Sequence, residues 1–280
     1  PNLDLRQNST IWGLYAQDEV AVGKKLVLNL GVRHDRNPVF GGTTNPRLAL
    51  IYSPRERSAV KFLYGEAFRA PSVNERFYDA EGFIPNPSLN PEKIRTYEVV
   101  WEQYVGERFR LSASGFHYAV RDLIDQVLDS DGNLIFRNLG RVNAKGLEME
   151  LERNWAWGLE SRVSYAYQQT EPREGGSLSN SPKHLGLIKL SAPLAKRKLF
   201  ASFDLQYMSK RRTLAGQEVG AHAVPNFTLF SQQLLKGWEI SASVYNFLNQ
   251  RYGDPAGVGF AQESIEQDGR SFRLKASYRF

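Results

Sequence analysis

The sequence contains no cysteine among its 280 residues. The absence of cysteine excludes disulfide scaffolds, thiolate zinc sites and cysteine nucleophiles, and it suits a protein of the cell envelope that avoids stray oxidation. The chain also lacks any run approaching the roughly 18 consecutive apolar residues that a transmembrane helix requires, which excludes a helical membrane protein. No basic segment followed by an apolar run stands at its start, so we expect a secretory signal to have been removed or to lie outside the sequence.

The sequence instead combines many aromatic residues and much glycine with a polar average. It holds 16 Phe, 13 Tyr and 5 Trp beside 23 Gly, and its mean hydropathy is −0.45 although 41% of its residues are hydrophobic. This profile is typical of sheets whose strands alternate apolar and polar residues. The net charge of +6 favours an anionic neighbour. On charge alone, lipid head groups, nucleic acid and acidic ligands are all open.

A period of two recurs along the chain, most clearly over residues 271–280, where every second residue is apolar. This period indicates a strand with one apolar and one polar face. The pattern predicts thirteen strands, near 10–20, 25–36, 45–54, 58–68, 93–105, 108–121, 134–153, 158–170, 181–193, 198–209, 222–234, 237–250 and 269–280.

The segments between these strands alternate between short turns and longer loops. The longer loops are rich in Gly, Pro, Asn and Ser and lie at 37–44, 69–92, 122–133, 171–180, 210–221 and 251–268. The alternation predicts an all-β, antiparallel, up-and-down barrel with short turns at one end and long loops at the other.

Strand length and tryptophan position favour a transmembrane barrel over a soluble sandwich. Many of the predicted strands reach 10 or more residues, whereas strands of soluble proteins have about five or six. An aromatic girdle at a membrane interface would account for four tryptophans beside short turns, namely Trp101, Trp155, Trp157 and Trp238. The period alone also allows a sandwich with its polar face outside.

Several motifs follow one another along the chain. They are Tyr15-Ala16-Gln17-Asp18-Glu19, Leu30-Gly31-Val32-Arg33-His34-Asp35, Asn45-Pro46-Arg47-Leu48, Tyr64-Gly65-Glu66-Ala67-Phe68-Arg69-Ala70-Pro71-Ser72, Asn86-Pro87-Ser88-Leu89-Asn90-Pro91-Glu92-Lys93, Tyr97-Glu98, Asn138-Xaa-Gly140, Lys145-Gly146-Leu147-Glu148-Met149-Glu150, Asn246-Phe247-Leu248-Asn249-Gln250-Arg251-Tyr252 and the terminal Phe280. Through these motifs and their order, the chain resembles the TonB-dependent outer-membrane receptors of Gram-negative bacteria. The motif that ends in Ser72 is the most specific of them.

The resemblance implies a 22-stranded barrel whose lumen holds an N-terminal plug. Since thirteen strands are predicted, we expect residues 1–280 to be the C-terminal portion of such a barrel, without the plug domain and the remaining strands. Because thirteen is odd, the first and last strands would run in the same direction. This chain alone could then not close into a barrel by the standard antiparallel pairing of its first and last strands.

The function that the resemblance implies is TonB-dependent uptake of a scarce nutrient, most often a ferric siderophore, in the outer membrane. The implied partners are this large nutrient, the TonB complex acting through the missing N-terminal region, outer-membrane lipid and lipopolysaccharide, and the barrel-assembly machinery, without nucleic acid. No cofactor and no enzymatic activity are expected. A passive porin or adhesin-type barrel and an outer-membrane hydrolase are the alternatives.

Arginine and aromatic residues of the long loops are candidate ligand contacts, because guanidinium groups and aromatic faces suit an anionic, aryl-bearing iron complex. These residues are Arg69, Arg76, Tyr78, Phe83, Arg211 and Arg212. For the two last arginines a solvated loop charge is the alternative.

The end of the chain resembles the signal that the barrel-assembly machinery reads. Its residues are Phe272, Leu274, Tyr278 and the terminal Phe280. An ordinary last strand is the alternative.

Other patterns predict no catalytic or metal site. Asp129-Ser130-Asp131-Gly132-Asn133 has its glycine at the fourth position rather than the sixth that a calcium loop needs, and Asp-Gly favours a tight turn. The four histidines are widely separated and are expected to be solvated or interfacial; they are His34, His117, His184 and His222. No Gly-Xaa-Ser-Xaa-Gly motif of a serine hydrolase occurs.

Overall fold

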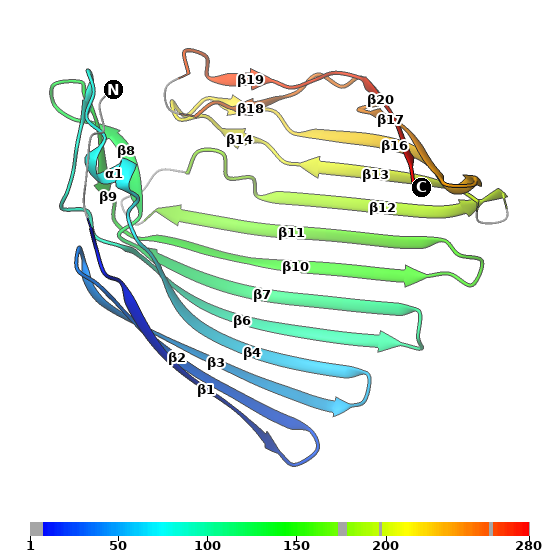
Figure 1. Ribbon diagram of the computed structural model, residues 1–280, viewed down its shortest axis with the longest axis horizontal. Helices are drawn as coiled ribbons and strands as arrows, with labels where there is room; N and C mark the ends of the chain where they lie inside the picture. Colours follow the sequence, from blue (N-terminus) through cyan, green and yellow to red (C-terminus); the bar gives the residue numbers. More distant parts are fainter. Residues whose placement is uncertain (1–7, 173–177, 196–197, 258–259, 280) are drawn as a thin grey trace. The chain divides into compact units, whose positions relative to one another are not determined.

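The main element of the structure, a computed structural model that describes residues 8–172, 178–195, 198–257 and 260–279, is an antiparallel sheet of thirteen strands (Figure 1). The order of the strands in the sheet follows their order in the chain. Both the number of strands and this meandering order confirm the prediction. The strands are β1 (Trp12–Val22), β2 (Leu26–Asn37), β3 (Gly41–Arg55), β4 (Ser58–Arg69), β6 (Glu92–Val105), β7 (Phe109–Arg121), β10 (Val142–Asn154), β11 (Glu160–Pro172), β12 (His184–Leu194), β13 (Leu199–Met208), β16 (His222–Leu235), β17 (Trp238–Tyr245) and β20 (Ser271–Tyr278).

The long loops carry small elements of their own, which the sequence pattern did not predict apart from residues 134–138. A three-stranded sheet has the order β5-β9-β8, and two hairpins pair β14 with β15 and β18 with β19. These elements are α1 (Val73–Phe77), β5 (Phe83–Ile84), β8 (Ile124–Leu128), β9 (Leu134–Asn138), β14 (Arg211–Arg212), β15 (Glu218–Val219), β18 (Gly253–Pro255) and β19 (Ser264–Glu266). Within the described residues, no helix combines the length and the apolar character needed to cross a membrane.

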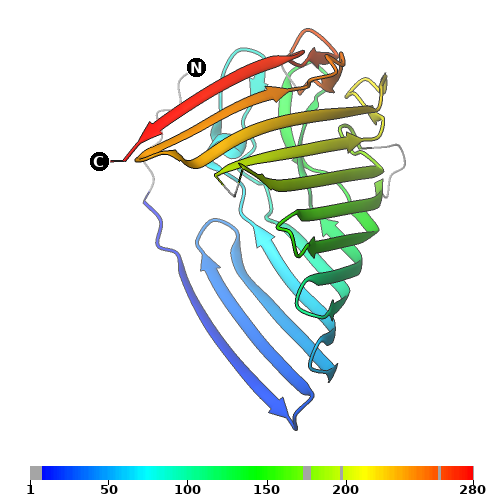
Figure 2. The ribbon, with the colours of Figure 1, turned by 90° about the vertical axis from the view of Figure 1, so that its right-hand side faces the viewer.

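The chain forms two compact units. The first comprises Pro1–Val100, Gly115–Lys145 and Thr170–Gly176, and the second comprises Trp101–Ser114, Gly146–Gln169 and Ser177–Phe280. In the second unit β16, β17 and β20 run side by side, coloured from dark yellow to red, and β20 is their edge strand (Figure 2).

Cross-strand register sorts the side chains of the second unit onto two faces. Lys189 lies opposite Asp204, and Asp204 lies opposite Asn226, so the three share one face. On this polar face Asn226 donates a hydrogen bond of 2.7 Å from Nδ2 to Asp204 Oδ2. The intervening residues point to the other face, because successive side chains of a strand alternate; they include Ile188, Leu190, Phe203 and Leu205.

The apolar face is exposed instead of being packed into a core. Leu147, Val163 and Leu274 are 60%, 41% and 78% exposed. Only four hydrophobic residues of the described part are buried, namely Leu89, Ile124, Val142 and Ala256. Since a sandwich buries its two apolar faces against each other, these exposures argue against the sandwich alternative.

The predicted strand 134–153 was wrong in extent, because the structure divides it into β9 and β10. The break follows Asn138, whose side-chain Nδ2 donates to the backbone oxygens of Asp122, at 2.7 Å, and Asn90, at 3.0 Å. β9 instead pairs with β8. A bond to a loop 48 residues away thus ends a strand that local alternation would continue.

The predicted strand 237–250 was also too long, because β17 ends at Tyr245. Asn246 follows with φ of 47°, and Asn249 has φ of 55°, both in the left-handed region that asparagine tolerates. The backbone N–H of Asn246 donates to Asn226 Oδ1 at 2.8 Å, and its side chain donates to the carbonyl of Gln250. The motif beginning at Asn246 is therefore a turn.

Candidate functional site

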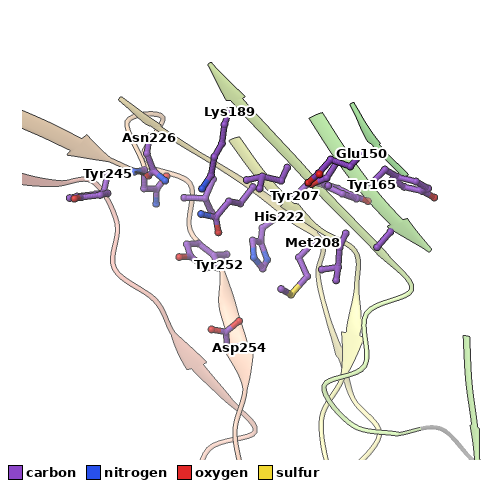
Figure 3. A pocket seen from close by; sticks show the side chains of 18 of the residues that line it. Glu150, Tyr165, Lys189, Tyr207, Met208, His222, Asn226, Tyr245, Tyr252 and Asp254 are labelled. Carbon is purple, nitrogen blue, oxygen red and sulfur yellow. Dashed lines mark hydrogen bonds between the residues drawn. The ribbon is translucent and has the colours of Figure 1, made fainter. Parts of the chain in front are cut away.

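A pocket of about 1070 Å³ lies in the second unit, where the strands meet the long loops (Figure 3). The last residue of β13, Met208, and the first residue of β16, His222, both line it. Tyr252 and Asp254 contribute from the loop after β17. The pocket thus combines strand and loop residues, as expected for a ligand site at the mouth of a barrel.

An apolar patch interrupts the polar face inside this pocket. Leu185 lies opposite Met208, and Leu187 lies opposite Gln206, which in turn lies opposite Val224. All five line the pocket. Four apolar side chains therefore meet at the loop end of an otherwise polar surface, where they can contact an apolar part of a ligand.

His222 is a buried polar residue at the edge of this patch. It is 8% exposed, and its ring lies 4.4 Å from the ring of Tyr252, measured between centroids. Its Nδ1 atom has no hydrogen-bond partner among the described residues. Burial and the nearby carboxylates of Asp254 and Asp268 raise the pKa of Tyr252, which keeps its hydroxyl protonated. The pair therefore offers a ligand the unpaired Nδ1 atom of His222 and the hydroxyl group of Tyr252.

Arg211 holds three loops of the second unit together. Its side chain is 3% exposed and lies 2.7 Å from an Asp254 carboxylate oxygen. The guanidinium also donates to the Asn180 side chain at 3.1 Å and to the Gly253 carbonyl at 3.0 Å. These bonds commit Arg211 to the loop framework, whereas its neighbour Arg212 is exposed.

An ion-pair network lies on the polar face below the pocket. Arg110 Nη1 is 2.7 Å from Glu150 Oε1 and 3.3 Å from Glu152 Oε2. Arg162 pairs with both glutamates as well. Glu150 also lines the pocket, and these two arginines already balance its charge there.

In the first unit, Glu92 connects two long loops. Arg69 donates to both of its carboxylate oxygens, at 2.6 and 2.8 Å, and the backbone N–H of Ile124 donates at 2.8 Å. Arg69 also bonds to Glu75 of α1 at 3.0 Å. Figure 1 shows α1, β8 and β9 of this unit gathered at one end of its strands.

Asparagines of the motifs complete the connection between these loops. Asn86 Nδ2 donates to the Phe136 carbonyl at 2.8 Å, and Asn138 Oδ1 accepts from the backbone N–H of Asn90 at 2.8 Å. The motifs that carry the family resemblance therefore hold the loops in place.

The other loop residues predicted as ligand contacts lie close together in the first unit. Arg76 donates to the Pro87 carbonyl, and its guanidinium lies 4.6 Å from the Phe77 ring centroid. The rings of Tyr78 and Phe83 meet edge to face, 5.1 Å apart. Their role in binding a ligand stays a prediction.

The predicted turn at Asp129 is confirmed. Gly132 has φ of 83°, and the backbone N–H groups of Asp131 and Asn133 both donate to Asp129 Oδ1 at 2.9 Å. These bonds lower the pKa of the Asp129 carboxyl below its usual value. The described part of the chain contains no cluster of three or more His, Asp or Glu residues that could hold a metal ion.

The predicted barrel-assembly residues share the apolar face of β20. Phe272 and Leu274 lie opposite Val244 and Ala242, and both are more than 70% exposed. The ring of Tyr278 lies tilted against the ring of Trp238, with the two centroids 5.2 Å apart. Phe280 lies outside the described residues.

The sequence pattern missed most of the pocket. The prediction that His222 is solvated or interfacial was wrong, because the residue is buried. Lys189, His222 and Asp254 belong to no short motif, and Tyr252 is the last residue of the motif that begins at Asn246. The one local signal was the apolar interruption of the polar face at Leu185, Leu187, Met208 and Val224.

Comparison with known proteins adds a family assignment. The profile of the TonB-dependent receptor-like β-barrel matches residues 1–247. The vitamin B12 transporter BtuB of Vibrio cholerae is 25% identical over 286 residues, which cover 98% of this chain and 43% of that protein. Heme/hemopexin utilization protein C of Haemophilus influenzae is 26% identical over 329 residues, covering 98% of this chain and 44% of that protein.

A solved structure shows the same fold. The ferric enterobactin receptor of Pseudomonas aeruginosa superimposes with a TM-score of 0.80 at 19% identity, covering 96% of this chain and 45% of the other. The chain thus spans less than half the length of each of these three proteins.

Proposed function

Because the chain belongs to the TonB-dependent receptor β-barrel family, we propose that it forms the C-terminal portion of an outer-membrane receptor that imports a scarce, bulky nutrient in a Gram-negative bacterium. The missing part of the receptor would supply the plug and the segment that engages TonB. A ferric siderophore is the first candidate cargo, and a corrinoid is the second because the vitamin B12 transporter is among the relatives.

The observation that carries this proposal is the pocket at the loop end of the polar face. Its volume is of the size that encloses a small-molecule ligand, for which pockets of about 300–1,000 Å³ are usual. Tyr78, Phe83 and Arg212 are proposed as further contacts from the loops, and Arg69, Arg76 and Arg211 as residues that hold those loops in shape.

The proposed partners follow from the family. The exposed apolar face would meet outer-membrane lipid and lipopolysaccharide, and the end of β20 would be read by the barrel-assembly machinery. The relatives carry the names of transporters, utilization proteins and receptors, which supports transport over catalysis.

Filling the pocket tests the proposal. In the complete receptor, Val224→Trp should reduce uptake of the cargo by about tenfold or more, because the indole would occupy the apolar patch. Val163→Trp is the matched control, since Val163 lies on the exposed apolar face. Uptake is measured in cells with and without TonB. Uptake that persists without TonB would indicate a passive porin instead.

A further inference from the structure

The ionisable residues that line the pocket are mostly acidic. Lys189 is the single lysine or arginine among the described lining residues. The carboxylates are Glu148, Glu150, Asp254 and Asp268.

Two of these carboxylates already have arginine partners. Glu150 pairs with Arg110 and Arg162, and Asp254 pairs with Arg211. Among the described residues, Glu148 and Asp268 form no salt bridge. Once the pairs are set aside, two carboxylates face one ammonium group, and the pocket holds no excess of positive charge.

Arg211, which pairs with the lining residue Asp254, is not available to an anionic ligand. Arg211 is almost fully buried and donates to Asp254, Asn180 and Gly253. Redirecting its guanidinium to a ligand would break three bonds and would leave the half-exposed carboxylate of Asp254 without its partner. Proteins that bind polyanions instead present accessible arginine or lysine groups.

The rest of the wall suits an uncharged surface. Leu185, Leu187, Met208 and Val224 provide the apolar patch. His222 Nδ1 is a buried atom without a partner, in a residue 92% buried from solvent, and such atoms normally have one. A ligand N–H or O–H group would supply it.

From this distribution of charge we infer that the cargo carries no net negative charge. The pocket takes a neutral or cationic metal complex with an apolar face, such as a corrinoid or an iron(III) trihydroxamate, and rejects a polyanionic iron(III) tris-catecholate. This inference rests on the proposed import function and names the cargo class.

Three probes of different charge test it on cells that display the complete receptor. They are neutral cyanocobalamin, cationic ferrioxamine B and polyanionic ferric enterobactin. We expect cyanocobalamin or ferrioxamine B to bind at least about tenfold more tightly than ferric enterobactin, because like charges placed together oppose binding. A smaller or reversed preference, or binding of none of the three, overturns the inference.

A charge substitution provides a second test. Glu148→Lys should tighten binding of ferric enterobactin by about threefold or more. Glu160→Lys makes the same change on the same face at the short-turn end and should alter it by less than about twofold. Binding is normalised to the amount of receptor in the outer membrane. Equal effects of the two substitutions, or no effect of Glu148→Lys, contradict the inference.

Different experimental results would reject the inference about cargo charge and the proposed import function. TonB-dependent growth supported by ferric enterobactin as the favoured cargo would leave import standing and reject the inference about charge. A receptor that supports no TonB-dependent uptake of any nutrient would reject the proposed function itself.

Discussion

At the scale of single residues, alternation decides which side chains can carry charge. Leu274 lies opposite Ala242 on the apolar face of β20, whereas Ser277 lies opposite Glu239 on the polar face. Both residues belong to the same short strand, so they differ chiefly in the face that they occupy. Lipid in contact with the apolar face would make that difference large.

We predict that Leu274→Arg destabilises the complete receptor by about 2–4 kcal/mol, because a guanidinium near the bilayer midplane loses its hydration. Ser277→Arg should cost much less, since its side chain faces the polar side. The free energy of unfolding is measured by urea titration of the receptor folded in lipid vesicles. Equal costs for the two variants would mean that the apolar face does not meet lipid.

At the scale of elements, the bonds between loops are the least local feature of the structure. Glu92 accepts from Arg69 of β4 and from Ile124 of β8, which lie 23 and 32 residues away. Arg69 is about half exposed while Glu92 is mostly buried, so the pair is only partly screened by water. Glu92 therefore acts as a junction between loops.

We expect Glu92→Gln to loosen both loops at a cost of about 1–2 kcal/mol, because the amide keeps one acceptor but loses the charge. The backbone amide of Ile124 should then exchange with solvent faster, as measured by hydrogen exchange. Glu81→Gln changes an exposed glutamate of the same segment and serves as the control. Unchanged protection of Ile124 in Glu92→Gln would show that the junction is not needed.

The elements also show how far sequence reasoning reaches. The alternation of apolar and polar residues is a local property of the sequence. It predicted the thirteen strands because each strand needs one apolar face. It failed at Asn138, whose side chain donates to the Asp122 carbonyl, and at Asn246, whose backbone N–H donates to the Asn226 side chain. Both bonds join groups that are distant in the sequence, and the strands end there. The pocket was missed for a related reason, since Leu185, Met208 and Val224 become neighbours only through the register of three strands.

At the scale of the whole molecule, the sheet has two edge strands in its described part. β1 pairs with β2 alone, and β20 pairs with β17 alone. Each edge leaves backbone N–H and C=O groups without ladder partners, which lipid cannot satisfy. With an odd number of antiparallel strands, these two edges also run in the same direction.

Residues 1–280 produced alone should therefore not yield a closed, monodisperse barrel. We expect oligomers or aggregates in detergent, detected by light scattering, and no shift in gel mobility on heating. The complete receptor is the control and should show both a single species and the heat-dependent shift. A protease-resistant monomer of residues 1–280 would contradict this expectation.

The junctions at Glu92 and Arg211 also have a consequence for how this surface can change over generations. In the proposed receptor these loops would face the cell exterior, where bacteriophages, toxins and antibodies would select for altered loops. A substitution at either junction would disturb several loops at once, so a change there would also alter the proposed binding surface. Variation should collect instead at the loop tips, such as residues 130–132 and 214–216, where the chain is exposed and its turns are closed by bonds within the same loop.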